Sequence, residues 1–295
     1  MIQEIGSIAF DNQFKAGMKA EENDFVFVFE AAEKGPDRIM LGGIVNDSPV
    51  SAQTDSAGKM VIPRFKDLDI DASMLTYAFS LGGDNFYMAM PGNSVPAPEG
   101  FSYESNRVLR KAQPKELAFA AMTACHLNIW YKDNQYCGRC GSRAVHDSKL
   151  RMVKCPECGN MIFPKICPAV TVAVIHEDKL LVSRYNGRAQ TNAYALIAGF
   201  VEIGESAEEC VAREVMEEVG LKVKNIRYYG SQPWGFVGNL QIGYVADVDG
   251  SAEITLDEEE LATAFFISRE ELEPIENRPA LTQEMIEDFR TGRLK

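Results

Sequence analysis

Basic residues are scarce in this chain. Its 295 residues include 30 Lys and Arg against 43 Asp and Glu, which gives a formal net charge of −13 at pH 7. A protein that grips nucleic acid mainly through its phosphates needs a basic surface, so this balance argues against that class. It also means that an anionic substrate must be attracted by metal ions and a few local cations.

Long apolar runs are missing as well. The longest candidate, residues 117–130, contains His126 and Asn128 and is shorter than the roughly 20 apolar residues that a membrane span requires. The first 14 residues carry Glu4 and Asp11 and have neither a basic head nor a sustained apolar stretch, so they are unlike a signal peptide. We therefore expect no membrane partner and a cytoplasmic location.

A dense group of glutamates is what the chain does contain. Ser206 and Glu209 have the spacing of a capping box, which predicts the start of a helix, and Gly220 suits the left-handed residue that ends one.

Within that helix, Glu214, Glu217 and Glu218 stand at i, i+3 and i+4 and therefore share a face, toward which Glu205 can fold back. Crowded carboxylates repel unless cations lie between them, which points to hard divalent ions such as Mg²⁺ or Mn²⁺. A solvated acidic helix is the alternative.

The surrounding residues favour the metal site over the solvated helix. Residues 199–221 fit the pattern G-x5-E-x7-R-E-U-x-E-E-x-G-U at every specified position, where U is a large aliphatic residue. This pattern is the signature of the Nudix hydrolases, which the chain resembles. The resemblance implies metal-assisted cleavage of a pyrophosphate, catalytic roles for the acids above, and an orienting role for Arg213 through a pair with Glu205. It also implies a further acid beyond the helix, which maps best onto Glu260. A small shift of the alignment would select Glu258 or Glu259 instead, and an ordinary charged loop is the alternative.

Two C-x-x-C pairs form a second motif. Cys137 and Cys140 are followed, after a short hairpin-like stretch, by Cys155 and Cys158. This spacing predicts a zinc site with four thiolate ligands, which is closed and therefore structural. Two disulfides are the alternative, but nothing else in the sequence suggests an oxidising compartment.

The segment Ser231-Gln232-Pro233-Trp234 narrows the resemblance. Together with the zinc ribbon and the acidic helix, it is similar to the NADH pyrophosphatase branch of the Nudix family. In that branch the segment continues Pro-Phe-Pro-x-Ser, whereas this chain has Gly235, Val237 and Asn239 at the Pro, Pro and Ser positions. The preference among NADH, NAD⁺ and other substrates therefore stays open.

Several residues are candidates for contact with the substrate. Flat aromatic rings pair well with nucleobases, so Trp234 and Phe200 are candidates for stacking, with core packing as the alternative. Tyr194, Ala198 and Gln232 complete the predicted substrate-binding set, on the resemblance of their segments to the same branch.

The resemblance predicts the hydrolysis of NADH or NAD⁺ to nicotinamide mononucleotide and AMP, and extends to removal of an NAD cap from RNA. One of Glu217, Glu218 and Glu260 would take a proton from the attacking water. Another Nudix activity, on ADP-ribose or a diadenosine polyphosphate, is one alternative. A non-catalytic zinc-ribbon protein that senses a nucleotide is another, although a sensor has no need of the whole acid set.

Strand and helix patterns divide the chain into four expected parts. Residues 1–112 are β-rich, with a hairpin signal at Gly82–Asn85; residues 113–135 form a connecting helix; residues 136–164 are the zinc ribbon. Residues 165–295 alternate strands and helices and, by resemblance, form the Nudix catalytic domain, an α/β/α sandwich. The fold class is therefore α/β, and the resemblance suggests a homodimer.

Overall fold

The structure, a computed structural model, describes residues 1–43, 59–92, 95–186 and 194–294. It separates into two compact units. The N-terminal unit contains Ile2–Lys165 and Trp234–Gly238, and the C-terminal unit contains Met1, Ile166–Pro233 and the chain from Asn239 onward. Each unit is described by itself, and the finer division into four parts stays a prediction.

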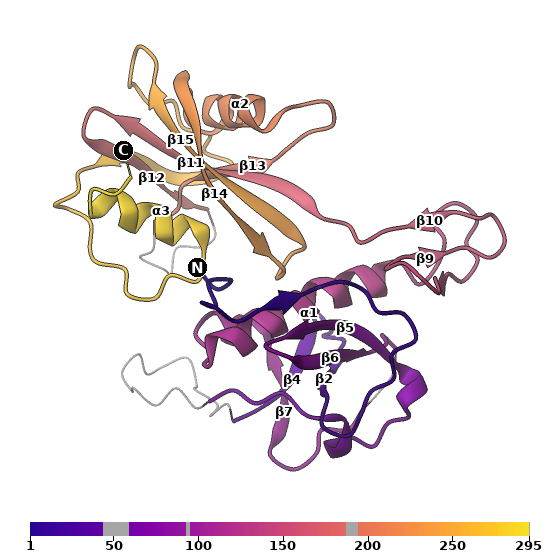
Figure 1. The fold of residues 1–295 in the computed structure, drawn as a ribbon. Helices are drawn as coiled ribbons and strands as arrows, with labels where there is room; N and C mark the ends of the chain where they lie inside the picture. Colours follow the sequence, from indigo (N-terminus) through magenta and orange to yellow (C-terminus); the bar gives the residue numbers. More distant parts are fainter. Residues whose placement is uncertain (44–58, 93–94, 187–193, 295) are drawn as a thin grey trace. The chain divides into compact units, whose positions relative to one another are not determined.

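Short strands form two sheets in the N-terminal unit before its long helix (Figure 1). One sheet has the order β1-β5-β6-β2 and another the order β3-β4-β7. Their strands are β1 (Phe10–Asp11), β2 (Phe25–Phe27), β3 (Phe29–Glu30), β4 (Arg38–Gly42), β5 (Leu75–Leu81), β6 (Asp84–Ala89) and β7 (Phe101–Ser105). Gly82 and Gly83, at φ 62° and 97°, form the turn between β5 and β6, which confirms the predicted hairpin. Short 3-10 helices span Phe65–Asp67, Ala72–Met74 and Asn106–Arg110.

Helix α1 (Lys115–Asp133) follows these sheets and confirms the predicted connecting helix. It leads into a three-stranded sheet of order β10-β9-β8 that carries the four predicted zinc ligands on its loops. The strands are β8 (Val145–His146), β9 (Val153–Lys154) and β10 (Met161–Ile162). The β-rich region and the ribbon expected from the sequence are therefore both present.

A six-stranded sheet forms the centre of the C-terminal unit. Its order is β14-β15-β11-β12-β16, with β13 paired to β11. The strands are β11 (Cys167–His176), β12 (Lys179–Tyr185), β13 (Ile197–Phe200), β14 (Val223–Trp234), β15 (Asn239–Val248) and β16 (Leu261–Ile267). Strands β11 and β15 run parallel, and β11 is antiparallel to both β12 and β13.

The two remaining helices, α2 (Ala207–Val219) and α3 (Leu281–Arg290), cover opposite faces of this sheet (Figure 1). Side chains alternate along β11, as they must in a strand. Val172 packs with Val211 and Val215 of α2, whereas Ala173 packs with Met285 and Phe289 of α3. This arrangement confirms the predicted α/β/α sandwich. Within the described ranges, no helix combines the length and the apolar character that crossing a membrane requires.

Candidate functional site

Helix α2 starts and ends where the sequence predicts. The Ser206 hydroxyl accepts a hydrogen bond from the Glu209 N–H at 3.3 Å, and the Glu209 carboxylate accepts one from the Ser206 N–H at 2.8 Å. This reciprocal capping box satisfies donors that a helix start leaves free. At the other end Gly220 is left-handed, with φ 69°, and its N–H donates to the Met216 carbonyl. Local sequence therefore sets the length of the helix that carries the acids.

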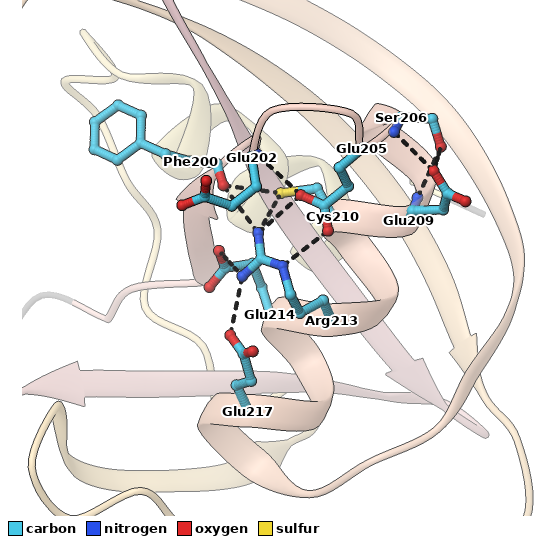
Figure 2. A network of polar contacts seen from close by, with 9 residues as sticks. All are labelled: Phe200, Glu202, Glu205, Ser206, Glu209, Cys210, Arg213, Glu214 and Glu217. Carbon is cyan, nitrogen blue, oxygen red and sulfur yellow. Dashed lines mark hydrogen bonds and ion pairs between the residues drawn. The ribbon is translucent and has the colours of Figure 1, made fainter.

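Arg213 holds three of the predicted acids together (Figure 2). Its Nε and Nη2 donate to the two oxygens of Glu205 at 2.8 and 2.9 Å, which is the predicted pair. Its Nη1 donates to Glu214 at 2.7 Å and to Glu217 at 2.9 Å, and Nη2 donates to the Phe200 carbonyl at 3.0 Å. The bonds from Arg213 lower the pKa of Glu205 to about 2. One guanidinium therefore orients a loop acid and two helix acids at once.

Gly199 makes room for Glu214. A Cβ atom built on Gly199, which lies on β13, would stand 1.9–2.2 Å from the carboxyl atoms of Glu214. Any larger residue would therefore push this carboxylate out of its place. The first glycine of the sequence pattern is explained by this close packing.

Glu218 is the least solvated acid of the set, with only 2% of its surface exposed. Neither carboxylate oxygen accepts a hydrogen bond of normal geometry from the described residues. Burial, together with the charges of Glu214 and Glu260, raises the pKa of Glu218 to about 8, although the nearby Ala198 N–H opposes the rise. A buried carboxylate without a partner is costly, so this position needs a compensating charge when the group is ionised.

The segment before β16 brings Glu260 to the same place. The Asp257 N–H donates to the Glu218 carbonyl at 3.0 Å and so ties this segment to the end of α2. Burial and the charge of Glu260 both raise the pKa of Glu214, as they do for Glu218. Asp257 also shapes the turn, since its carboxylate accepts from the Glu259 N–H at 2.9 Å. The sequence pattern alone did not identify Asp257. The signal that could have identified it is the tendency of an aspartate to accept a hydrogen bond from the backbone N–H two residues later.

This donor set fits a hard divalent cation. Its candidate ligand atoms are carboxylate oxygens, which Mg²⁺ and Mn²⁺ prefer. The partnerless oxygens of Glu218 and the mutual repulsion of the acids are both relieved by a cation. Among the described residues, only the four ribbon cysteines already lie close enough together to share one ion, so metal binding by Glu214, Glu217, Glu218 and Glu260 stays a prediction.

The predicted substrate contacts before α2 lie in two different places. The ring of Phe200 is 54% exposed and points away from the ion-pair network (Figure 2), and the Ala198 backbone lies beside Glu218. Tyr194 instead packs with the cluster on the α3 side of the sheet, with its ring under Arg184 at 5.1 Å. The backbones of Phe200 and Ala198 therefore contact residues of α2, namely Arg213 and Glu218, whereas Tyr194 packs on the α3 side of the sheet.

Gln232 has a structural task in the C-terminal unit. Its side chain is fully buried, and its Nε2 donates to the Pro279 carbonyl at 2.8 Å. Its Oε1 accepts from the Leu281 N–H, the first residue of α3, at 2.6 Å. Both ends of the amide are thus used to join β14 to α3.

Trp234 belongs to the N-terminal unit. Its ring is 9% exposed and packs edge-on against Phe236, with the Arg110 guanidinium 5.4 Å from both ring centroids. A Cβ atom on Gly235 would lie 2.3 Å from the Met122 carbonyl of α1, so a residue with a side chain fits at this position only if the backbone shifts. Core packing occupies the Trp234 ring here, and its stacking on a base stays a prediction.

The four cysteines of the ribbon converge. The Sγ atoms of Cys137 and Cys158 lie 3.6 Å apart, those of Cys140 and Cys155 lie 3.4 Å apart, and all four lie within 4.8 Å of one another. These thiols are free, because a disulfide needs about 2.05 Å. Sulfurs about 2.3 Å from a tetrahedral ion lie roughly 3.8 Å apart, so the cluster fits such an ion. A hydrogen bond from the Arg139 N–H lowers the pKa of Cys137 to about 6, which favours the thiolate.

The family model of the NUDIX domain matches residues 165–289. These residues form a NUDIX domain. The match begins with the segment entering β11 and includes both helices that flank the sheet. The resemblance to the Nudix hydrolases, predicted from the glutamate pattern, is confirmed.

Two curated proteins that are similar to this chain narrow the resemblance further. The chain is 41% identical over 166 residues to the NAD-capped RNA hydrolase NudC of Photobacterium profundum, covering 56% of this chain and 61% of that protein. It is 38% identical over 164 residues to the protein of the same name from Pseudomonas aeruginosa, covering 56% of this chain and 58% of that protein. The chain thus spans about three fifths of the length of these curated relatives. Their similarity supports the NADH pyrophosphatase branch.

Among solved structures, a NUDIX hydrolase from Nitrosomonas europaea aligns with a TM-score of 0.46 at 19% identity, covering 54% of this chain and 92% of that one.

Proposed function

We propose that this chain hydrolyses the pyrophosphate bond of NADH or NAD⁺ and releases nicotinamide mononucleotide and AMP. The observation that carries the proposal is the buried, partnerless carboxylate of Glu218 beside Glu214 and Glu260. Cations stabilise such a set when its carboxyls are ionised, and hard cations readily share their remaining sites with phosphate oxygens. The NAD part of the substrate rests on the names of the similar proteins.

In this proposal Glu214, Glu217, Glu218 and Glu260 hold Mg²⁺ or Mn²⁺. Bound ions supply positive charge that binds the pyrophosphate, offsets charge on the leaving phosphate and lowers the pKa of the attacking water. One of Glu217, Glu218 and Glu260 accepts the proton from that water.

Arg213 acts on the acids rather than on the substrate. Its donors are directed at Glu205, Glu214, Glu217 and the Phe200 carbonyl, so it holds the loop and the helix in register. The exposed ring of Phe200 offers a flat surface for a nucleobase at the edge of this site.

The cysteine cluster holds Zn²⁺ in a structural role. Four thiolates fill a tetrahedral ion and leave no position for substrate. Metal analysis of the purified protein should therefore find about one zinc per chain that remains after Mg²⁺ and Mn²⁺ are removed.

Two further parts of the proposal, removal of an NAD cap from RNA and a homodimer, rest on resemblance. A cytoplasmic location rests on the first 14 residues, which are unlike a signal peptide. Light scattering tests the dimer and cell fractionation the location. The free thiols of the cluster agree with a reducing compartment.

The decisive experiment ranks kcat/KM for NADH, NAD⁺, ADP-ribose, diadenosine polyphosphate and NAD-capped RNA in the presence of Mg²⁺ or Mn²⁺. We expect NADH, NAD⁺ or the capped RNA to rank first. Glu217→Gln and Glu218→Gln should each lower turnover more than about 100-fold, beyond the usual effect of losing an outer partner of a metal site. Near-full activity in either variant would disprove the metal site, and a first rank for ADP-ribose would move the substrate to another Nudix class.

A further inference from the structure

The small ribbon sheet presents one row of side chains to solvent. Lys154 of β9 pairs with Met161 of β10 on one side and with Val145 of β8 on the other. Residues directly opposite one another in adjacent strands point to the same face. All three are exposed, so this row lies on an open face of the sheet.

Neighbouring residues extend the same face. Arg143 lies two residues before Val145 and pairs with Tyr136 in an isolated bridge, and Phe163 lies two residues after Met161. A spacing of two returns a side chain to the same face of a strand. The Tyr136 and Phe163 side chains are 64% and 53% exposed. We call these six residues, Tyr136, Arg143, Val145, Lys154, Met161 and Phe163, the ribbon face.

The other side of the ribbon sheet packs on the body of the N-terminal unit. Val153, one residue from Lys154, is buried, and the His146 ring stacks on Tyr131 of α1 with the centroids 5.0 Å apart. Arg151, in the loop before β9, donates to the Ala78 carbonyl of β5. The ribbon is therefore anchored on one side and open on the other.

The charge of the ribbon is opposite to that of the chain. Residues 136–164 contain five Lys and Arg against two Asp and Glu, in a chain of net charge −13. Metal-bound thiolates add negative charge at the knuckles, and the Asp147 carboxylate lies near enough to Lys154 for their charges to interact. The six residues of the ribbon face themselves include Arg143 and Lys154 and no carboxylate. Neither side chain forms an ion pair with any of the residues that the structure describes.

We propose that the ribbon face binds single-stranded RNA, namely the chain that follows the NAD cap of a capped substrate. Exposed aromatic rings on a sheet stack on unpaired bases, and basic side chains between them contact phosphates. Tyr136 and Phe163 supply the rings, and Arg143 and Lys154 the cations. The inference rests on the proposed function for the capped substrate, and it explains how an acidic chain binds a polyanion.

A second copy of this chain is the competing occupant. In a two-fold dimer through this face, the same patch meets itself, so the Arg143 and Lys154 side chains of both copies gather without compensating acids. RNA neutralises these charges, whereas a second copy adds to them. The charge of the face therefore favours RNA.

The test measures RNA binding without the cap chemistry. A fluorescent, unstructured, uncapped oligoribonucleotide is titrated with the full-length, zinc-loaded chain at several salt concentrations. Tyr136→Ala and Phe163→Ala should each weaken binding about fivefold or more, because each base loses a stacking partner. Arg143→Ala with Lys154→Ala should make the slope of log K against log salt shallower by about 1.4, or about 0.7 for each lost phosphate contact.

Matched controls come from exposed residues elsewhere. Lys19→Ala with Lys34→Ala removes two exposed charges of the same unit, and Tyr228→Ala removes a ring that is 62% exposed. None of the control variants should change RNA affinity. Zinc content and circular dichroism show that each ribbon variant is folded, and Phe163→Tyr should restore binding.

Hydrolysis separates this inference from the proposed function. In the ribbon variants, kcat/KM for NADH should be unchanged, whereas kcat/KM for NAD-capped RNA should fall about fivefold or more. A wild-type protein without activity on any NAD compound overturns the proposed function, while its RNA affinity still tests the ribbon face. The inference fails if wild-type protein does not bind the uncapped RNA or if ribbon variants bind it normally. It also fails if light scattering shows that those variants dissociate a dimer while their RNA affinity is unchanged.

Discussion

Replacing Glu218 by glutamine should stabilise the metal-free protein at high pH. Burial raises the pKa of the folded-state carboxyl to about 8, from an ordinary value of 4.5. Between these values the folded state holds a proton that the unfolded state has released, so the contribution of Glu218 to stability is complete below pH 4.5 and is lost as the pH rises through 8. Glutamine does not titrate and escapes this loss.

The size of the effect follows from the pKa. One proton changes the free energy of unfolding by at most about 1.4 kcal/mol per pH unit. As the pH rises from 5 to 8, the free energy of unfolding of the Glu218→Gln variant should therefore increase by up to about 4 kcal/mol relative to that of the wild type. Burying an unpaired amide costs about 1–3 kcal/mol at every pH, so the change with pH isolates the carboxylate.

The assay must report on α2. Both tryptophans, Trp130 and Trp234, lie in the N-terminal unit, so tryptophan fluorescence does not report on the NUDIX domain. Amide hydrogen exchange of α2 peptides, corrected for the intrinsic effect of pH and measured without Mg²⁺ or Mn²⁺, gives the local free energy. The control is Glu217→Gln, whose side chain is 57% exposed and whose curve should run parallel to that of the wild type.

Two results would refute this reasoning. One is a difference between Glu218→Gln and wild type that stays constant from pH 5 to pH 8. The other is equal protection of α2 by added Mn²⁺ in both proteins, because the wild type alone has the buried carboxylate that the cation neutralises.

Three further variants probe the site and the ribbon. Gly199→Ala should lower kcat about 100-fold or more with α2 intact, because its Cβ displaces the Glu214 carboxylate; unchanged kcat contradicts this. Arg213→Lys should lower kcat about tenfold, since an ammonium cannot span both oxygens of Glu205 as the guanidinium does, and wild-type turnover would show that the fork is unnecessary. Cys155→Ser should remove the zinc and expose residues 136–164 to proteases while the NUDIX domain stays folded; retained stoichiometric zinc would argue against the four-thiolate site.

Features whose partners are close in the sequence were predicted well. The capping box of α2 joins residues three positions apart, and the turn at Gly82 and Gly83 needs only its own backbone conformation. The Arg213–Glu205 pair is also local, since the two residues flank the start of α2. Such features depend on spacing along the chain and on the conformational preferences of the residue types, both of which can be read directly from the sequence.

The sequence did not indicate contacts between residues far apart in the chain. Trp234 and Gln232 were predicted to contact substrate, which stays a prediction; the structure adds that Arg110 lies by the Trp234 ring and that Gln232 bonds to Pro279 and Leu281. A motif shows that residues matter without showing which distant atoms they contact. The reason for a glycine at position 235 is visible only in the tertiary structure, where the backbone of α1 lies too close for a side chain.

By itself, the sequence determined the helix that carries the glutamates and the pairing of the two C-x-x-C motifs, and it predicted their roles as metal ligands, because each follows from spacing along one segment. Only the tertiary structure decided which of the acids is buried. Glu218 is buried because β13 and the Asp257 segment close over the end of α2. Likewise, strand register alone brought Lys154 between Val145 and Met161. Burial and register arise from contacts between segments far apart in the chain, and spacing within one segment does not encode them.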